Sequence, residues 1–173
     1  MTATKNIFRK YLNNVFIETG SFYGDGISLA LEAGFKKIYS IELSPHHHKH
    51  CIERFKYFPQ VTLILGDSYL VLPELLKTIN EPITFWLDGH YSEGDTVMSK
   101  YESPLMQELD AINNHSINTH TIIIDDLRCW NKEKHGFDTE IIKTKCLEIN
   151  PNYSFIFEDG YVASDILVAK ILL

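Results

Sequence analysis

Residues 15–26 read VFIETGSFYGDG, and this stretch decides how the rest of the chain is interpreted. A short apolar run ends in Glu18, and glycines follow at Gly20, Gly24 and Gly26. Glycine adopts positive φ and lets a ligand approach the main chain, so a strand that breaks into such a loop before a helix is typical of a nucleotide-binding turn. The order is GxxxGxG, whereas a dinucleotide site reads GxGxxG. The alternative from this loop alone is a glycine-rich turn of another α/β protein.

Short apolar, β-branched runs recur along the chain, with enough residues between them for helices. These runs occupy residues 15–19, 37–42, 61–65, 83–88 and 120–126. The helices expected between and after them are 26–33, 45–57, 69–80, 102–114 and 138–149. Apolar runs without polar alternation indicate strands buried on both faces of a parallel sheet.

Two further strands are expected at 153–159 and 163–173. The link between them is too short for a parallel crossover, so they should form an antiparallel hairpin. The sequence therefore predicts an α/β fold whose sheet is seven-stranded and mostly parallel, with a C-terminal antiparallel hairpin.

Composition narrows the class of protein. With 173 residues, 45% of them hydrophobic, we expect one domain over residues 1–173. The formal charge of −7 argues against a nucleic-acid or anionic-membrane surface and favours a small or neutral substrate. There are three cysteines without a CxxC pair, and neither a signal peptide nor an 18-residue apolar run is found. We therefore expect a cytoplasmic protein.

Acidic residues stand at or just after the end of each of the first five strands, where ligands of doubly wound sheets bind. They are Glu18, Glu42, Asp67, Asp88 and the pair Asp125 and Asp126. A lone carboxylate is usually a solvated loop residue. Because an acidic residue occurs at five consecutive strand ends, we do not interpret these carboxylates as solvated loop residues.

Asp88, Asp125 and Asp126 carry a sharper argument, because the strands before them are expected to be neighbours. Three unpaired carboxylates at one place would repel one another and raise their own pKa values. A hard divalent cation with oxygen ligands removes that conflict.

The motifs ETGSFYGDG, WLDGHYSEGDT and IIIDD together resemble those of class I S-adenosylmethionine (SAM)-dependent methyltransferases. The last two resemble the metal-dependent O-methyltransferases, which include catechol O-methyltransferase and the macrolide-sugar enzymes of the macrocin (TylF) type. The resemblance implies the Rossmann-like class I methyltransferase sandwich and two cofactors, SAM and Mg²⁺ or Mn²⁺.

Site residues follow from the same resemblance. It places SAM against Glu18, Gly20, Ser21, Tyr23, Gly24, Glu42, Asp67 and Ser68. It places the metal on Asp88, Asp125 and Asp126, and makes His90 and Asp88 the catalytic pair, with His90 as the base. The macrolide-sugar enzymes tend to have aspartate in the position of His90, so an adenine-stacking or loop-ordering histidine is the alternative.

The acceptor side is less defined. Residues 91–103 are expected to form a lid and 127–138 an acceptor wall, in which Trp130 either stacks on a sugar or simply packs. Arg128 or His135 could hydrogen-bond acceptor hydroxyls. Only about fourteen residues precede the motif that begins at residue 15, so we expect an open acceptor site or one closed by a second subunit of a homodimer. The HHHKH run at 46–50 is interpreted as a solvated helix face.

The sequence thus favours a metal-assisted O-methyltransferase that acts on a hydroxyl group of a small molecule or glycan, and a sugar hydroxyl is the acceptor we expect. One alternative is a metal-free methyltransferase with a nitrogen or carboxyl acceptor. The other is a non-catalytic module that binds a nucleoside.

Overall fold

The computed structural model describes residues 5–89 and 103–172. Seven strands form one sheet: β1 (Val15–Thr19), β2 (Lys37–Glu42), β3 (Val61–Leu65), β4 (Ile83–Leu87), β5 (Thr121–Ile124), β6 (Tyr153–Glu158) and β7 (Ile166–Ile171). The α-helices are α1 (Lys5–Lys10), α2 (Asp25–Ala33), α3 (Pro45–Phe55), α4 (Ser68–Leu76), α5 (Leu105–Asn113), α6 (Lys132–His135) and α7 (Thr139–Ile149). A 3₁₀ turn, η1 (Leu127–Cys129), follows β5.

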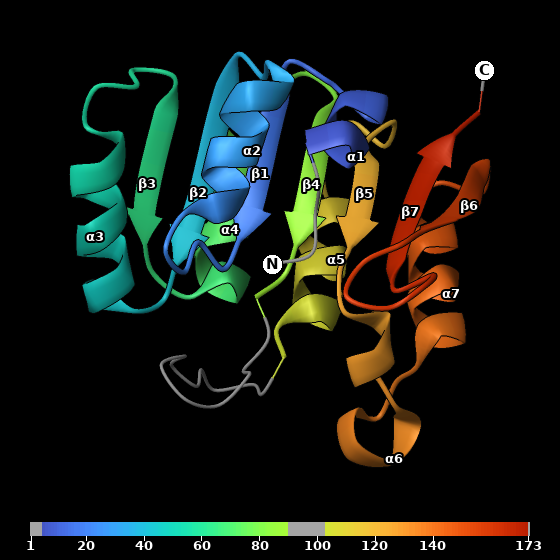
Figure 1. Cartoon of the computed structure of the whole chain (residues 1–173). Helices are drawn as coiled ribbons and strands as arrows, with labels where there is room; N and C mark the ends of the chain where they lie inside the picture. The colour runs from blue at the N-terminus through green and yellow to red at the C-terminus, as the bar shows by residue number, and fades with distance from the viewer. Residues whose placement is uncertain (1–4, 90–102, 173) are drawn as a thin grey trace.

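The sheet has the order β3-β2-β1-β4-β5-β7-β6. Neighbouring strands from β3 to β5 are parallel, while β7 lies antiparallel between β5 and β6. The predicted mostly parallel sheet with a C-terminal antiparallel hairpin is confirmed, as is the expectation that β4 and β5 are neighbours. Because β1 to β5 run in the same direction, their carboxyl ends share one edge of the sheet (Figure 1).

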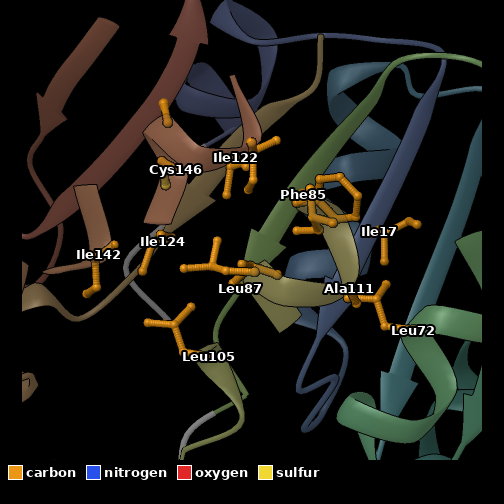
Figure 2. Close-up of a cluster of buried hydrophobic side chains, with 14 of the residues drawn as sticks. Ile17, Leu72, Phe85, Leu87, Leu105, Ala111, Ile122, Ile124, Ile142 and Cys146 are labelled. Atoms are coloured by element: carbon orange, nitrogen blue, oxygen red, sulfur yellow. The ribbon is translucent and has the colours of Figure 1, made fainter. Parts of the chain in front are cut away.

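The central strands are buried on both faces, which explains their unbroken apolar sequences. Alternate residues of each strand enter different hydrophobic clusters: Ile17 and Phe85 face one cluster, while Phe16 and Trp86 face the other. Helices α4, α5 and α7 contribute to the first cluster, part of which Figure 2 shows. Helices α1, α2 and α3 contribute to the second.

Several elements differ from the sequence-based expectations. Helix α1 was not expected, because its segment is mixed in polarity; the spacing of Ile7, Phe8 and Tyr11, all buried, explains how it packs. The predicted helices 45–57 and 69–80 end earlier, at Phe55 and Leu76. β3 is an edge strand and is only partly buried. Among the described residues, no helix is long and apolar enough to cross a membrane.

Candidate functional site

The turns that follow β1, β2 and β4 lie against one another at the carboxyl edge of the sheet. The backbone N–H of Gly20 donates to Ile41 O at 2.9 Å, and the N–H of Asp88 donates to Thr19 O at 3.3 Å. Gly20 has φ +85°, and a β-carbon there would lie 2.9 Å from Asp88 O. Only glycine fits this approach. The glycine loop and the turn after β4 are therefore packed main chain to main chain.

Helix α3 supports the glycine loop from the side. Gly24 begins α2 with φ +86°, and a β-carbon on it would lie 2.4 Å from the Phe55 ring. Arg54 donates from Nη1 to Tyr23 O at 2.5 Å and to Asp25 Oδ1 at 2.8 Å. Cys51 Sγ donates to Phe22 O at 3.3 Å. These contacts fix the loop in one conformation.

Glu42 holds the opposite side of the same loop. It is 7% exposed, and its two carboxylate oxygens accept the N–H groups of Phe22, at 2.8 Å, and of Ser44, at 2.7 Å. Phe22 is a non-glycine residue with φ 48°, a conformation that side chains disfavour. A carboxylate offers about four acceptor positions, so Glu42 retains capacity for further hydroxyl donors.

Glu18 lies beneath the loop and is completely buried. Ser40 Oγ donates to Glu18 Oε2 at 2.6 Å, and Ser21 and Ser40 share a 2.5 Å hydrogen bond. Burial raises the pKa of Glu18 to about 8; the bond from Ser40 opposes this rise, and the charges of Glu42 and Asp25 add to it. Contact of Glu18 and Ser21 with a cofactor stays a prediction, because both side chains support the loop from below.

Glu108, which the sequence analysis did not select, lies under the turn after β3. It is 1% exposed, and its neighbours are Thr19, Ser68 and Gly89. Burial raises the pKa of Glu108 to about 7, while the hydroxyls of Ser68 and Thr19 oppose the rise and the charge of Asp67 adds to it. Asp67 and Ser68, two of the predicted cofactor residues, are therefore next to a buried acid on α5.

The raised pKa of Glu108 predicts a pH-dependent stability. Between the unfolded value of 4.5 and the folded value of about 7, the folded state binds more protons, so the free energy of unfolding falls as pH rises through this window. We expect Glu108→Gln to gain about 2 kcal/mol relative to wild type between pH 5.5 and pH 8. Urea unfolding at both pH values measures the difference. Glu18 also makes the free energy of unfolding fall as pH rises, but it does so equally in wild type and variant, so its effect cancels in the difference. If the free energy of unfolding changed equally with pH in the two proteins, the prediction would be wrong.

Asp88, Asp125 and Asp126 come together as expected. Each offers a carboxylate oxygen, and these atoms all lie within 4.8 Å of one another. Asp125 is buried and accepts the N–H of Asp126 at 2.8 Å, whereas Asp88 and Asp126 are partly buried. Burial and the charges of Asp125 and Asp126 raise the pKa of Asp88 well above its usual range. The acidic trio can hold a hard cation through oxygen ligands.

Arg128 pairs with the acidic side chains of Asp126 and Asp165. Its Nη1 donates to Asp126 Oδ1 at 2.5 Å and to the buried carboxylate of Asp165. The backbone N–H of Arg128 also donates to Asp165, at 3.0 Å, and its guanidinium lies over the Tyr161 ring. This network places Arg128 beside the acidic trio as a counter-charge.

Residues 127–138 were expected to form the acceptor wall, but Trp130 in this segment is buried. Trp130 is 8% exposed and lies 5.4 Å from both the Phe137 and His135 rings. This favours the packing alternative for Trp130 over stacking on a sugar.

The histidines of the run at 46–50 on α3 differ in how far they are buried. His46 and His50 are exposed, as expected for a solvated face. His47, in contrast, is buried against Phe22 and Tyr23.

His90, the predicted base, and most of the expected lid at 91–103 lie outside the described residues. The turn that leads to His90 is described as far as Gly89, next to the acidic trio. Its role stays a prediction from the sequence.

Comparison with known proteins identifies the architecture. No protein-family model and no curated protein matches the sequence. Among solved structures, an O-methyltransferase from Bacillus cereus in complex with S-adenosylhomocysteine (SAH) has a TM-score of 0.67 at 14% identity, over 96% of this chain and 78% of that one. This is the class I methyltransferase fold.

Two further structures with this fold are similar over nearly the whole chain. TomG, an O-methyltransferase from Streptomyces achromogenes in complex with SAM, has a TM-score of 0.66 at 12% identity and covers 98% of this chain and 78% of its own. The SAH-bound methyltransferase PaMTH1 from Podospora anserina has a TM-score of 0.59 at 11% identity, over 98% and 76%. The class I methyltransferase fold inferred from the motifs is confirmed, and identities this low establish the fold alone.

The sequence analysis missed Arg54, Glu108 and Asp165. Glu108 carries a usable signal, because it lies three residues after Leu105 and four before Ile112 on the buried stripe of α5. An acid on an apolar stripe is unusual and indicates a local function. Arg54 and Asp165 have no such signal, since their partners are distant in sequence.

Proposed function

We propose that this chain is a SAM-dependent O-methyltransferase assisted by a divalent cation. The observation that carries the proposal is the convergence of Asp88, Asp125 and Asp126 beside the glycine loop, at the edge of the sheet where this fold binds ligands. A hydroxyl acceptor at the trio and a methyl donor on the loop would be neighbours. Much of the catalysis would then be the positioning of two reactants.

The glycine loop and Glu42 form the proposed SAM site. When bound, SAM supplies an electrophilic methyl group on a sulfonium centre. The main chain from Gly20 to Gly24 would face its amino-acid end, and the free acceptor positions of Glu42 would receive the ribose hydroxyls. Asp67 and Ser68 would border the adenine. Because Arg54 and Glu42 already fix the loop, little ordering would remain to be done on binding.

The acidic trio fits Mg²⁺ or Mn²⁺ by its chemistry. Its donors are carboxylate oxygens, and the raised pKa of Asp88 reflects burial together with the negative charge of Asp125 and Asp126, which a cation would neutralise. When bound, the cation would polarise the acceptor hydroxyl as a Lewis acid. Asp88, Asp125 and Asp126 would hold and orient it, and His90 would accept the hydroxyl proton.

A metal-free methyltransferase is the second candidate, and one observation favours it. Arg128 already pairs with Asp126 at 2.5 Å, so a side chain of the protein neutralises part of the charge of the trio. In that case the aspartates would orient a nitrogen or carboxyl acceptor. Retention of full activity in excess EDTA would select this candidate over the metal-assisted one.

For the acceptor we propose a sugar hydroxyl group, on a small molecule or a glycan. The net charge of −7 supports an uncharged acceptor over nucleic acid or an anionic membrane. We propose also that a homodimer closes the acceptor side, which sedimentation at several protein concentrations tests. Incubation with SAM and a panel of sugars, catechols and amines, followed by detection of SAH, tests the class of acceptor.

Glu42→Ala should weaken SAH binding by about 1–3 kcal/mol, because charge-assisted hydrogen bonds are lost and the N–H groups of Phe22 and Ser44 lose their acceptor. Calorimetry with SAH measures the change, and NAD⁺ serves as the competing ligand class. Glu53→Ala, which removes an exposed acid of α3, the helix that follows β2, should bind SAH as wild type does. Tighter binding of NAD⁺ than of SAH by the wild type would reject the proposed cofactor.

A further inference from the structure

The carboxyl group of Glu108 lies where three turns of the candidate site meet. Thr19, the last residue of β1, stands at the start of the turn after β1; Ser68, the first residue of α4, stands at the end of the turn after β3; and Gly89 lies in the turn after β4. A β-carbon on Gly89 would lie 3.2 Å from Thr19 Oγ1 and 3.5 Å from Glu108 Oε1. These three turns come from separate parts of the sequence, and α5 inserts one acid among them.

Within residues 5–89 and 103–172, no salt bridge involves this acid. Each salt bridge found on α5 in the described chain involves Asp110, which is exposed and pairs with Lys145. Glu108 is 1% exposed, and its polar neighbours are the hydroxyls of Thr19 and Ser68. Neither Thr19 Oγ1 nor Glu108 Oε1 completes a hydrogen bond of standard geometry within the described residues. Burying such an acid is costly, so a purely structural role would be served better by an apolar residue.

The electrostatic surroundings of Glu108 differ from those of the acidic trio. The charge that acts on it is that of Asp67, which precedes α4, whereas Asp88 is influenced by Asp125, Asp126 and Glu18. Through its contact with Ser68, the first residue of α4, Glu108 lies beside the turn after β3, on that side of the site. Under the proposed function, that side borders the adenine.

We propose that Glu108 is a positioning residue for the adenosine half of the cofactor, acting through Ser68 and Thr19. Its carboxyl oxygens hold the turn after β3 against the turns after β1 and β4, so the walls of the nucleoside site keep one spacing. The inference rests on the proposed use of SAM, and it names the residue that fixes that part of the site. It assigns no chemical step to Glu108.

Two substitutions separate the polar contacts from the packing. Glu108→Gln keeps the size and an acceptor oxygen, whereas Glu108→Leu keeps much of the volume and loses the acceptor. We expect Glu108→Gln to bind SAH within about threefold of wild type, and Glu108→Leu to bind about tenfold more weakly, because the polar contacts of the carboxyl group with Ser68 and Thr19 are lost. Calorimetry at pH 5.5, below the raised pKa of the wild-type carboxyl, makes the comparison with glutamine fair.

A matched control removes the effect of disturbing α5. Ile112→Val alters a fully buried residue of the same helix and should lower stability slightly without changing SAH affinity. 5′-Methylthioadenosine, which has the nucleoside but not the amino-acid end, should show the same tenfold loss with Glu108→Leu. Under turnover, that variant should raise KM for SAM and leave kcat nearly unchanged at saturating SAM.

The outcomes are distinguishable from those of the proposed function. If wild type binds neither SAH nor 5′-methylthioadenosine, the proposed cofactor is wrong. If wild type binds SAH and Glu108→Leu binds it equally well, only the positioning role is overturned. A loss seen with SAH but not with 5′-methylthioadenosine would also overturn it, because Glu108 would then act at the amino-acid end.

Discussion

Asp88→Asn and Asp125→Asn should each lower turnover by roughly 10²–10³ while SAH affinity stays within a fewfold of wild type. The reason is that the trio lies beside the glycine loop and would act on the acceptor, whereas SAH would be held by the loop and Glu42. Steady-state assays with saturating SAM, together with calorimetry on the same preparations, measure the two quantities.

Stability provides an internal check on these variants. Asp88 is repelled by Asp125 and Asp126, so Asp88→Asn removes unfavourable charge and should not lower the melting temperature. Asp110→Asn, the same change at an exposed acid of α5, should leave turnover unchanged. Wild-type activity should vanish with EDTA and return with Mg²⁺ or Mn²⁺. Unchanged turnover in both trio variants would remove the acidic trio from the mechanism.

His90→Ala should lower turnover by roughly 10²–10⁴, the usual contribution of a positioned acid–base group, with SAH binding nearly intact. A base must be neutral to accept a proton, so the wild-type rate should rise with pH through a value near 6.5, the ordinary pKa of histidine. The variant should lose that rise. Rate–pH profiles of both proteins test it.

The control for this prediction is His46→Ala, since His46 is exposed on α3 and belongs to the histidine run. It should be as active as wild type. If His90→Ala loses only a fewfold, the acceptor hydroxyl ionises without a protein base. A phenol or catechol would then be a better acceptor than a sugar.

The order of strands and helices could be predicted from the sequence because it depends on residues close together in the chain. Strands such as 15–19 and 83–87 are short β-branched runs, and the helix expected at 26–33 ends at Ala33, before Gly34 with φ 105°. The antiparallel hairpin followed from the shortness of one link. Helix α1 was missed because its few buried residues become a pattern only when α2 and β1 are present to cover them.

By itself, the sequence determined the order of elements, the glycine loop, and the placement of acids at the strand ends. Tertiary structure alone decided which of those acids meet. Asp88, Asp125 and Asp126 converge because β4 and β5 are neighbours, while Glu18 turns inward to Ser40 and Glu42 is occupied by the main chain of Phe22. Likewise, Arg128 pairs with Asp165 across 37 positions, and Glu108 reaches three turns. The physical reason is range: backbone preferences and hydrophobic periodicity act over a few residues, whereas the burial and charge of a side chain depend on whichever distant segments the sheet order brings beside it.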